Sequence, residues 1–411
     1  MSKTNKLSLK ENFSWNLLGS IVYSLSQFLI LVLLNKLGSP LMVGLYSLGL
    51  AFSTPIIMFT NLQLRQIQAT DTSDEYIFND YFALRIITGF IATVITIIVL
   101  VISNYDMYKS IIILLVLLNK IIDSYSDVIF GKLQQCERMD YIGKSRVIKG
   151  ILTLIIMGVI LNLTQNLILS LIAINFTWLL IFWFYDRNKI KLYISDFSPT
   201  FNFKKMKNLS VLAFPLGIVM MLNSLDTNLP RIIVEKFLGE EALGYFASIA
   251  YLIVAGNLFI QSVGQAFLPI MAKLYKNNSI KTFKRIVFIL IFLGMSTGAI
   301  GLIISLFFGE FILTVLYDVS YSKYSYILIL IMISGMFSYS ASFLGYSITA
   351  MRLFRIQPYI GFVGVVVTLV SSVIFIPQYG LSGAAYTLIV GSITHFLVRL
   401  IVVLTNIKNI N

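Results

Sequence analysis

The sequence has little charge for its length. Of its 411 residues, 12% are Asp, Glu, Lys or Arg, whereas 58% are hydrophobic. Soluble domains usually carry about 25% charged residues, so the composition excludes a soluble globular protein. The hydrophobic residues also gather in runs of about 20, the length that an α-helix needs to cross a bilayer. The sequence therefore predicts an integral membrane protein.

Chemically reactive side chains are equally scarce. The chain has one histidine, His395, and one cysteine, Cys136, so an internal disulfide is excluded. The sequence contains no HExxH, GxSxG or CxxC pattern and no glycine-rich phosphate loop. A membrane-bound glycan polymerase or transferase usually needs a large extramembrane loop, and the largest segment predicted on the outer side of the membrane is only 309–323. We therefore expect a protein that is not an enzyme, with a glycan polymerase or transferase as the less favoured alternative.

The hydrophobic runs predict helices. They lack the strict alternation of barrel strands and are too long for them, so each is expected to cross the membrane as an α-helix. We expect twelve spans, of which the fifth and sixth are separated by the weakest break. Their expected limits are 13–37, 41–60, 81–103, 108–130, 146–162, 166–185, 210–237, 242–268, 284–308, 324–347, 357–376 and 381–404.

Lysine and arginine are unevenly distributed between the two sides of the membrane. With a cytoplasmic N-terminus, the outside segments hold only Lys36, Lys109, Lys236 and Lys323 of the 31 such residues. Positive residues favour the cytoplasmic side, so both termini are expected there. The net charge of +13 then reflects topology, and nucleic acid is not an expected partner. The basic loops are expected to lie against anionic lipids.

The two halves of the chain look related. Residues 35–51, NKLGSPLMVGLYSLGLA, align with residues 235–251, EKFLGEEALGYFASIAY, at an offset of 200 residues. Six spans per half would give both halves the same orientation, as in a parallel pseudo-two-fold repeat about the membrane normal. We therefore expect two six-helix lobes around a central polar cavity. The expected limits are 1–185 for the N-terminal lobe, 186–209 for a basic cytoplasmic linker and 210–411 for the C-terminal lobe.

The fourth predicted span carries charges near the middle of the membrane. Asn119, Asp123 and Asp127 follow one another at four-residue intervals and form one stripe on a helix. Lys120 precedes Asp123 by three residues and is expected to pair with it. Because a charge at the bilayer centre costs about 2.5–3.5 kcal/mol on insertion scales, the stripe must face protein or water. We favour the wall of a polar cavity; the alternative is a buried ion pair that only docks helices.

Other spans extend this polar pattern. Pro230 cannot donate a hydrogen bond to the carbonyl of Asp226, so a helix kink is expected beside that carboxylate. Single amides in spans more often join helices than bind ligands, but a set in both halves predicts a cavity with more cations than carboxylates. The set includes Asn16, Gln27, Arg85, Lys149, Asp226, Arg231 and Gln261.

Several segments, in this order along the chain, resemble the bacterial polysaccharide transporter family. They are NFSWNLLGSIVYSLSQFLILVLLNKLG from residue 12, GLYSLGLAFSTP from residue 44, LQLRQIQATD at 62–71, YFALR at 81–85, QQCERMDYIGKSRVIKG at 134–150 and IPQYGLSGAAY at 376–386. The superfamily also holds drug/cation antiporters and peptidoglycan-precursor flippases. The resemblance implies a flippase that moves undecaprenyl-pyrophosphate-linked oligosaccharides across the bacterial cytoplasmic membrane by alternating access. Its product would serve capsule, exopolysaccharide or another surface polysaccharide.

The resemblance also implies roles for the polar residues. Cations near the inner mouth would hold the pyrophosphate, and amides would line the glycan cavity; the expected set is Arg65, Arg85, Lys120, Lys149, Asn16, Gln27, Gln261 and Arg231. Asp226 or Asp127 would couple transport to H⁺ or Na⁺, with no metal or other cofactor, while Asp123 stays paired with Lys120. Expected partners are the lipid-linked substrate, anionic lipids and the polysaccharide assembly machinery. A drug or small-molecule cation antiporter of the same fold is the alternative.

Overall fold

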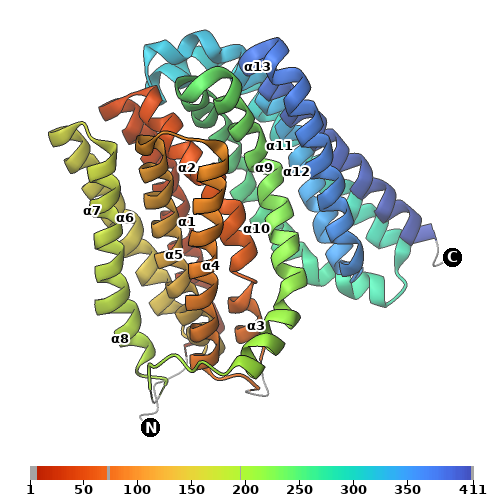
Figure 1. Ribbon diagram of the computed structural model, residues 1–411. Helices are drawn as coiled ribbons and strands as arrows, with labels where there is room; N and C mark the ends of the chain where they lie inside the picture. The colour runs from red at the N-terminus through yellow and green to blue at the C-terminus, as the bar shows by residue number, and fades with distance from the viewer. Residues whose placement is uncertain (1–6, 72–74, 195, 409–411) are drawn as a thin grey trace. The chain divides into compact units, whose positions relative to one another are not determined.

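The protein folds entirely into helices over the residues that the computed structural model describes, which are 7–71, 75–194 and 196–408 (Figure 1). The chain divides into two compact units, Met1–Ser224 and Leu225–Asn411. Their boundary lies inside a continuous helix, so this division does not decide the predicted limits of the lobes and their linker. The all-helical fold expected from the hydrophobic runs is confirmed.

The first unit contains eight α-helices and the start of a ninth among its described residues. Two π-helical segments, Leu34–Gly38 and Phe182–Asp186, extend α1 and α7. The helices are α1 Leu9–Leu33, α2 Pro40–Thr60, α3 Leu64–Thr70, α4 Phe78–Ser103, α5 Met107–Gln135, α6 Met139–Thr164, α7 Leu167–Ile181, α8 Arg187–Ile190 and the first half of α9 Phe203–Tyr251.

Local sequence explains where these helices begin. The Ser8 hydroxyl accepts from the backbone N–H of Glu11 at 3.2 Å, and the Glu11 carboxylate accepts from the N–H of Ser8 at 2.9 Å, a capping box. Asp106 caps α5 by accepting from the N–H of Lys109 at 2.8 Å. Asn166 caps α7 directly after Gln165, which has a φ of 51°. The weak break predicted between the fifth and sixth spans is therefore a real helix boundary.

Helix α5 is the central helix of the first unit. It contacts α2, α3, α4, α6, α7 and α8, and α1 packs along α6 (Figure 1). Gly19 and Gly143 allow the close approach of α1 and α6, because a Cβ on Gly19 would lie 2.6 Å from the Cα of Gly143. The position of α5 explains how its polar stripe avoids lipid: protein surrounds the helix.

The second unit is built around α12. Its helices are the rest of α9, α10 Ile253–Lys276, α11 Ile280–Leu316, α12 Ser325–Ala350 and α13 Gln357–Lys408, with 3₁₀ turns at Val319–Tyr324 and Phe354–Ile356. Helix α12 contacts α10, α11 and α13. Helices α9 and α13 each contain one glycine with non-helical dihedral angles, Gly239 and Gly380. These breaks fall where loops were predicted, at 238–241 and 377–380.

The number of membrane crossings stays a prediction. Over the described residues, nine helical stretches are long and apolar enough to cross a membrane. Two of them, Phe203–Lys276 and Phe354–Ile407, have 74 and 54 residues and contain the glycine breaks, so each is long enough for more than one crossing. Helix α5 is not among the nine because of its charged stripe. The predicted count of twelve is compatible with these lengths but is not established by them.

The segments aligned at the 200-residue offset have matching environments. Residues 41–50 and 241–250 are both helical, and they show the same succession of exposed and buried positions. Gly44 and Gly244 are buried in both, as are Tyr46 and Phe246. This agreement is what an internal repeat requires; the full two-fold relation between the units stays a prediction.

Candidate functional site

The polar stripe on α5 connects that helix to two others. Asp127 forms an ion pair with Arg65 of α3, in which Arg65 Nη1 lies 3.3 Å from Asp127 Oδ1. Asp123 forms an ion pair with Lys149 of α6, in which Lys149 Nζ lies 3.3 Å from Asp123 Oδ1. The partner predicted for Asp123 was Lys120; sequence spacing favoured that neighbour, but packing brings α6 to the same carboxylate. Both carboxylates of the stripe are thus held by cations from other helices.

The Arg65 pair is partly open to its surroundings. The side chains of Arg65 and Asp127 are 17% and 32% exposed. Arg65 also donates from Nε and Nη2 to Gln134 Oε1, at 3.2 and 3.1 Å. Helix α3 begins directly after Leu62 and Gln63, whose φ angles are 52° and 51°. This left-handed turn separates α3 from α2 and positions the guanidinium beside α5.

Lys149 also pairs with Asp186, and this second pair is the most buried ion pair among the described residues of the unit, whereas the Asp123 side chain is 36% exposed. The Lys149 side chain is 1% exposed, and its Nζ lies 3.6 Å from Asp186 Oδ2, whose side chain is also 1% exposed. Lys149 donates to Ser126 Oγ at 2.7 Å, and Ser126 donates to Asp186 Oδ2 at 2.7 Å. The indole ring of Trp178 lies 4.9 Å from Nζ. Before Lys149 could contact a pyrophosphate, it would have to leave both carboxylates.

Asp186 was missed by sequence reasoning, which placed it at the start of the linker. It ends the π-helical segment Phe182–Asp186. The extra residue in a π turn rotates the following side chains around the helix axis, and here the rotated carboxylate points inward. The signal available in the sequence was its position directly after the apolar run of the sixth predicted span.

Arg85 is buried in α4 with only part of its hydrogen-bonding capacity used. Its Nη1 donates to Asn61 Oδ1, while Nε and Nη2 have no hydrogen-bond partner among the described residues. The residue is 1% exposed. An unsatisfied buried donor costs about 1–3 kcal/mol. Such a guanidinium is therefore able to gain free energy from an anionic or polar ligand that reaches it.

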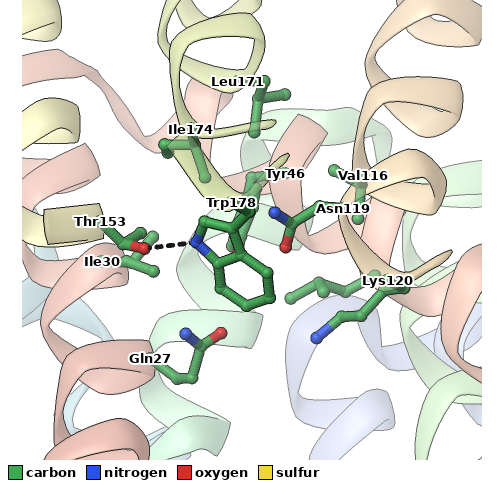
Figure 2. Close-up of a pocket in the computed structure, with 11 residues that line it drawn as sticks. Gln27, Ile30, Tyr46, Val116, Asn119, Lys120, Thr153, Leu171, Ile174 and Trp178 are labelled. Atoms are coloured by element: carbon green, nitrogen blue, oxygen red, sulfur yellow. Dashed lines mark hydrogen bonds between the residues drawn. The ribbon is translucent and has the colours of Figure 1, made fainter. Parts of the chain in front are cut away.

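Lys120 lines a narrow pocket instead of joining an ion pair among the described residues. Figure 2 shows its ammonium group and the Gln27 amide pointing into the space beside the indole ring of Trp178. The indole N–H donates to Thr153 Oγ1 at 2.9 Å, which fixes the ring, and Asn119 is on the same wall. The pocket offers about 10 Å³ to the centre of a water molecule, close to the minimum for holding one water.

The remaining predicted residues are distributed over both units. Asn16 is half-buried on α1, three turns before Gln27. Gln261 is exposed on α10 of the second unit. Arg231 of α9 is half-buried and donates from Nη1 to Asn228 Oδ1 at 3.3 Å. Gln27 and Lys120 are therefore the two predicted substrate-binding residues that the structure brings to one pocket.

A second ionisable cluster lies in the second unit. Asp226 Oδ2 lies 3.0 Å from His395 Nε2, and Asp226 Oδ1 accepts from Thr368 Oγ1 at 2.6 Å. Gly364 makes room for the histidine ring, because a Cβ at that position would overlap His395 Nε2. The backbone remains helical through Pro230, and the non-helical residue of α9 is Gly239. Asp226 is thus held by the single histidine of the chain, which sequence reasoning noted but did not connect to it.

Metal ions in proteins are usually bound by clusters of His, Cys, Asp and Glu side chains. Among the described residues, no group of three or more such side chains could hold a metal ion.

Two sequence comparisons match most of the chain. The family described as polysaccharide biosynthesis protein matches residues 9–275. The chain is also 32% identical to the capsular polysaccharide biosynthesis protein CapF of Staphylococcus aureus over 385 residues, which cover 92% of this chain and 95% of CapF.

Solved structures with a similar fold are membrane transporters. The lipid II flippase MurJ in an inward closed conformation matches with a TM-score of 0.72 and 16% identity, covering 95% of this chain and 88% of MurJ. A mutant of the Vibrio cholerae MATE transporter VcmN matches with a TM-score of 0.64 and 12% identity, covering 97% of each chain. Identities this low show the fold alone. They confirm the predicted helical transporter fold.

Proposed function

Because the chain belongs to the polysaccharide biosynthesis protein family and has the fold of the MurJ and MATE transporters, we propose that it carries undecaprenyl-pyrophosphate-linked oligosaccharides across the bacterial cytoplasmic membrane. Family membership confirms the resemblance found in the sequence and makes the protein a multi-pass membrane transporter of polysaccharide biosynthesis, not an enzyme. The substrate, the membrane and the cytoplasmic location of both termini are part of the proposal. CapF supports a capsular product, since its name describes capsular polysaccharide biosynthesis.

The observation that carries the proposal is the set of unused cationic donors in the first unit. Lys120 lies in the pocket beside Gln27, and Arg85 has two donors without partners among the described residues. A pyrophosphate offers several acceptor oxygens, and charge-assisted hydrogen bonds to it are roughly twice as strong as neutral ones. A cationic drug would instead need unpaired carboxylates, and Asp123 and Asp127 are already neutralised by Lys149 and Arg65.

Alternating access requires these donors to become accessible in another conformation. The pocket around Lys120 holds about one water in this structure, so a glycan cannot occupy it here. We propose that rocking of the helices around α5 widens this pocket toward the cytoplasm and opens it to the pyrophosphate. The partly exposed Arg65–Asp127 pair would exchange its partners during that movement.

Transport of a bulky anion also needs a driving force. We propose that Asp226 couples the cycle to a proton or sodium gradient, because it lies beside His395 and Thr368 in the second unit. Asp127 is the weaker candidate, since its carboxylate is already engaged in the ion pair with Arg65.

The test compares two lysines of the same helix. In a strain whose own copy of the gene is deleted, we expect lipid-linked oligosaccharides to accumulate on the inner leaflet. Lys109→Gln, in the first turn of α5 and not among the residues that line the Lys120 pocket, should restore export. Export restored by Lys120→Gln should be lower than export restored by the native protein by a factor of about ten or more, as expected from one lost charge-assisted hydrogen bond.

The amount of folded protein in the membrane must be equal for both variants. Normal export by Lys120→Gln at equal protein amount would remove Lys120 from the substrate site. A deletion strain without accumulated lipid-linked sugar would refute the flippase function itself. In that case increased sensitivity of the deletion strain to cationic drugs would favour the alternative, a drug or small-molecule cation antiporter of the same fold.

A further inference from the structure

The second unit has an open pocket that the transport cycle described above does not use. It is lined by residues that include Ala242, Lys323, Tyr324, Tyr326, Gly380 and Ser382, and we name it the tyrosine pocket. Its volume is about 420 Å³, within the range of about 300–1,000 Å³ that is usual for small-molecule sites. The pocket around Lys120 is far smaller.

Two helix breaks lie at or beside the residues that line this pocket. Gly239 has a φ of 87° and interrupts α9, and Gly380 has a φ of 60° and interrupts α13. These values lie in the region that favours glycine. A Cβ added to either glycine would meet no atom within 4 Å. Gly380 itself lines the pocket, and Gly239 lies between the pocket residues Leu238 and Ala242 of α9.

A rigid group of tyrosines supports one wall of the pocket. The ring centroids of Tyr245 and Tyr324 are 4.6 Å apart, those of Tyr245 and Tyr321 are 4.7 Å apart, and those of Tyr321 and Tyr317 are 4.9 Å apart. The Tyr317 hydroxyl donates to the backbone carbonyl of Ser248 at 2.8 Å. Tyr245, Tyr317 and Tyr321 are buried, so these rings face protein. An ordinary interfacial belt of tyrosines would face lipid headgroups instead.

Lys323 is held at the rim by this wall. Its Nζ lies 5.3 Å from the centroid of the Tyr245 ring and 4.9 Å from that of Tyr324. The ion pairs found among the described residues do not include Lys323, and its side chain is exposed. Cation–π contacts at exposed sites contribute about 0.5–1 kcal/mol, enough to favour this position without neutralising the charge. The Glu241 carboxylate accepts from the Tyr245 hydroxyl at 3.4 Å, so an anionic group entering the pocket would meet a cation that forms no ion pair among the described residues.

We propose that the tyrosine pocket binds a sugar ring of the exported glycan and prefers a sugar that carries a carboxylate. The faces of a sugar ring are rows of C–H groups, which pack on aromatic rings, while its hydroxyl groups require polar partners at the edges. Tyr324 and Tyr326 provide the aromatic surface, the Ser382 hydroxyl provides a polar edge, and Lys323 holds the carboxylate.

This inference rests on the proposed function for the origin of the sugar. In the topology predicted from the distribution of Lys and Arg, Lys236 and Lys323 lie outside the cytoplasm, so this end of the unit would meet the glycan after translocation. Binding there would retain the glycan on the outer side and reduce its return through the transporter.

The experiment measures saccharide binding by the purified full-length protein in lipid nanodiscs, using saturation-transfer NMR. The probes are digalacturonic acid, an acidic disaccharide, and galactobiose, its neutral counterpart. We expect both to bind, with the acidic sugar binding more tightly. Lys323→Gln should weaken the binding of digalacturonic acid by about threefold, as expected for one exposed charge pair. It should leave the affinity for galactobiose unchanged.

Two further variants separate stacking from charge. Tyr326→Ala should weaken the binding of both sugars, because it removes part of the aromatic surface. The fold should be unaffected, since Tyr326 is exposed and the buried tyrosine group stays intact. Lys281→Gln, an exposed lysine at the start of α11, should change neither affinity. Failure of the native protein to bind either sugar, or equal effects of the Lys323 and Lys281 substitutions, would overturn the proposal.

The outcome is independent of the flippase assay. If sugars bind as expected but the deletion strain accumulates no lipid-linked oligosaccharide, the pocket stands and the proposed function fails. If the deletion strain accumulates the lipid and no sugar binds, the function stands and the pocket fails.

Discussion

Replacement of Lys149 by methionine should strongly destabilise the first unit. The substitution keeps an unbranched apolar side chain one atom shorter than lysine, but it leaves the Asp186 carboxylate, 1% exposed, and the Asp123 carboxylate, 36% exposed, without their cation. Breaking a buried ion pair by removing one partner costs about 3–5 kcal/mol. Since 1.4 kcal/mol is a factor of ten, the ratio of folded to unfolded protein should fall by more than about a hundredfold. Ser126 would still donate to Asp186, which places the loss toward the lower end of that range.

A second substitution separates lost charge from lost packing. Asp186→Asn alone should cost less than Lys149→Met, because Lys149 keeps Asp123 at 3.3 Å. The double variant Lys149→Met/Asp186→Asn should recover much of the stability, since the one carboxylate it leaves without Lys149 is Asp123, whose side chain is 36% exposed. The assay is the fraction of monodisperse protein after heating detergent-solubilised membranes, followed by fluorescence-detected size exclusion.

The matched control is Lys144→Met on the same helix. Lys144 is 44% exposed and its Nζ lies 3.9 Å from Asp140 Oδ2, so its loss should change stability by less than about 1 kcal/mol. Equal heat resistance of the Lys149 and Lys144 variants would refute the structural role of the buried pair. It would instead favour Lys149 as a ligand for the pyrophosphate.

Two further predictions concern packing and coupling. Gly143→Ala should destabilise the folded protein by about 1–3 kcal/mol, because the added Cβ would overlap the backbone carbonyl of Trp15 on α1. Gly158→Ala on the same helix is the control: its Cβ meets no atom within 4 Å, so it should leave stability unchanged. Equal yields of folded protein from the two variants would contradict the contact between Gly143 and α1. Asp226→Asn in proteoliposomes should abolish the response of transport to an imposed proton or sodium gradient, since the amide cannot bind and release a proton and lacks the negative charge that attracts a sodium ion. An unchanged response would end the proposed coupling role of Asp226.

The membrane environment and the helical fold could be predicted from the sequence because they depend on local composition. Runs of about 20 apolar residues with few charges can satisfy their backbone groups in lipid only as helices. The internal repeat at an offset of 200 residues could likewise be recognised from the sequence alone. Residues 41–50 and 241–250 share one pattern of burial. The family resemblance came from the order of motifs along nearly the whole chain.

The partners of the charged residues were decided only by tertiary structure. Sequence spacing placed Lys120 beside Asp123, yet the helix α6 supplies Lys149 to that carboxylate, and a π turn at the end of α7 adds Asp186. Residue spacing predicts neighbours within one helix only. The partner of a buried charge also depends on which side chains the other helices bring close to it. Lys120 is thereby left to line a pocket with Gln27.

The pairing of Asp226 with His395 has the same origin. The two residues are 169 positions apart, and no periodicity relates them. Their contact depends on how α9 and α13 pack, and on the absence of a side chain at Gly364 that makes room for the imidazole. The sequence determined which residues could not face lipid; the packing of helices determined which of them neutralise one another and which stay available to a ligand.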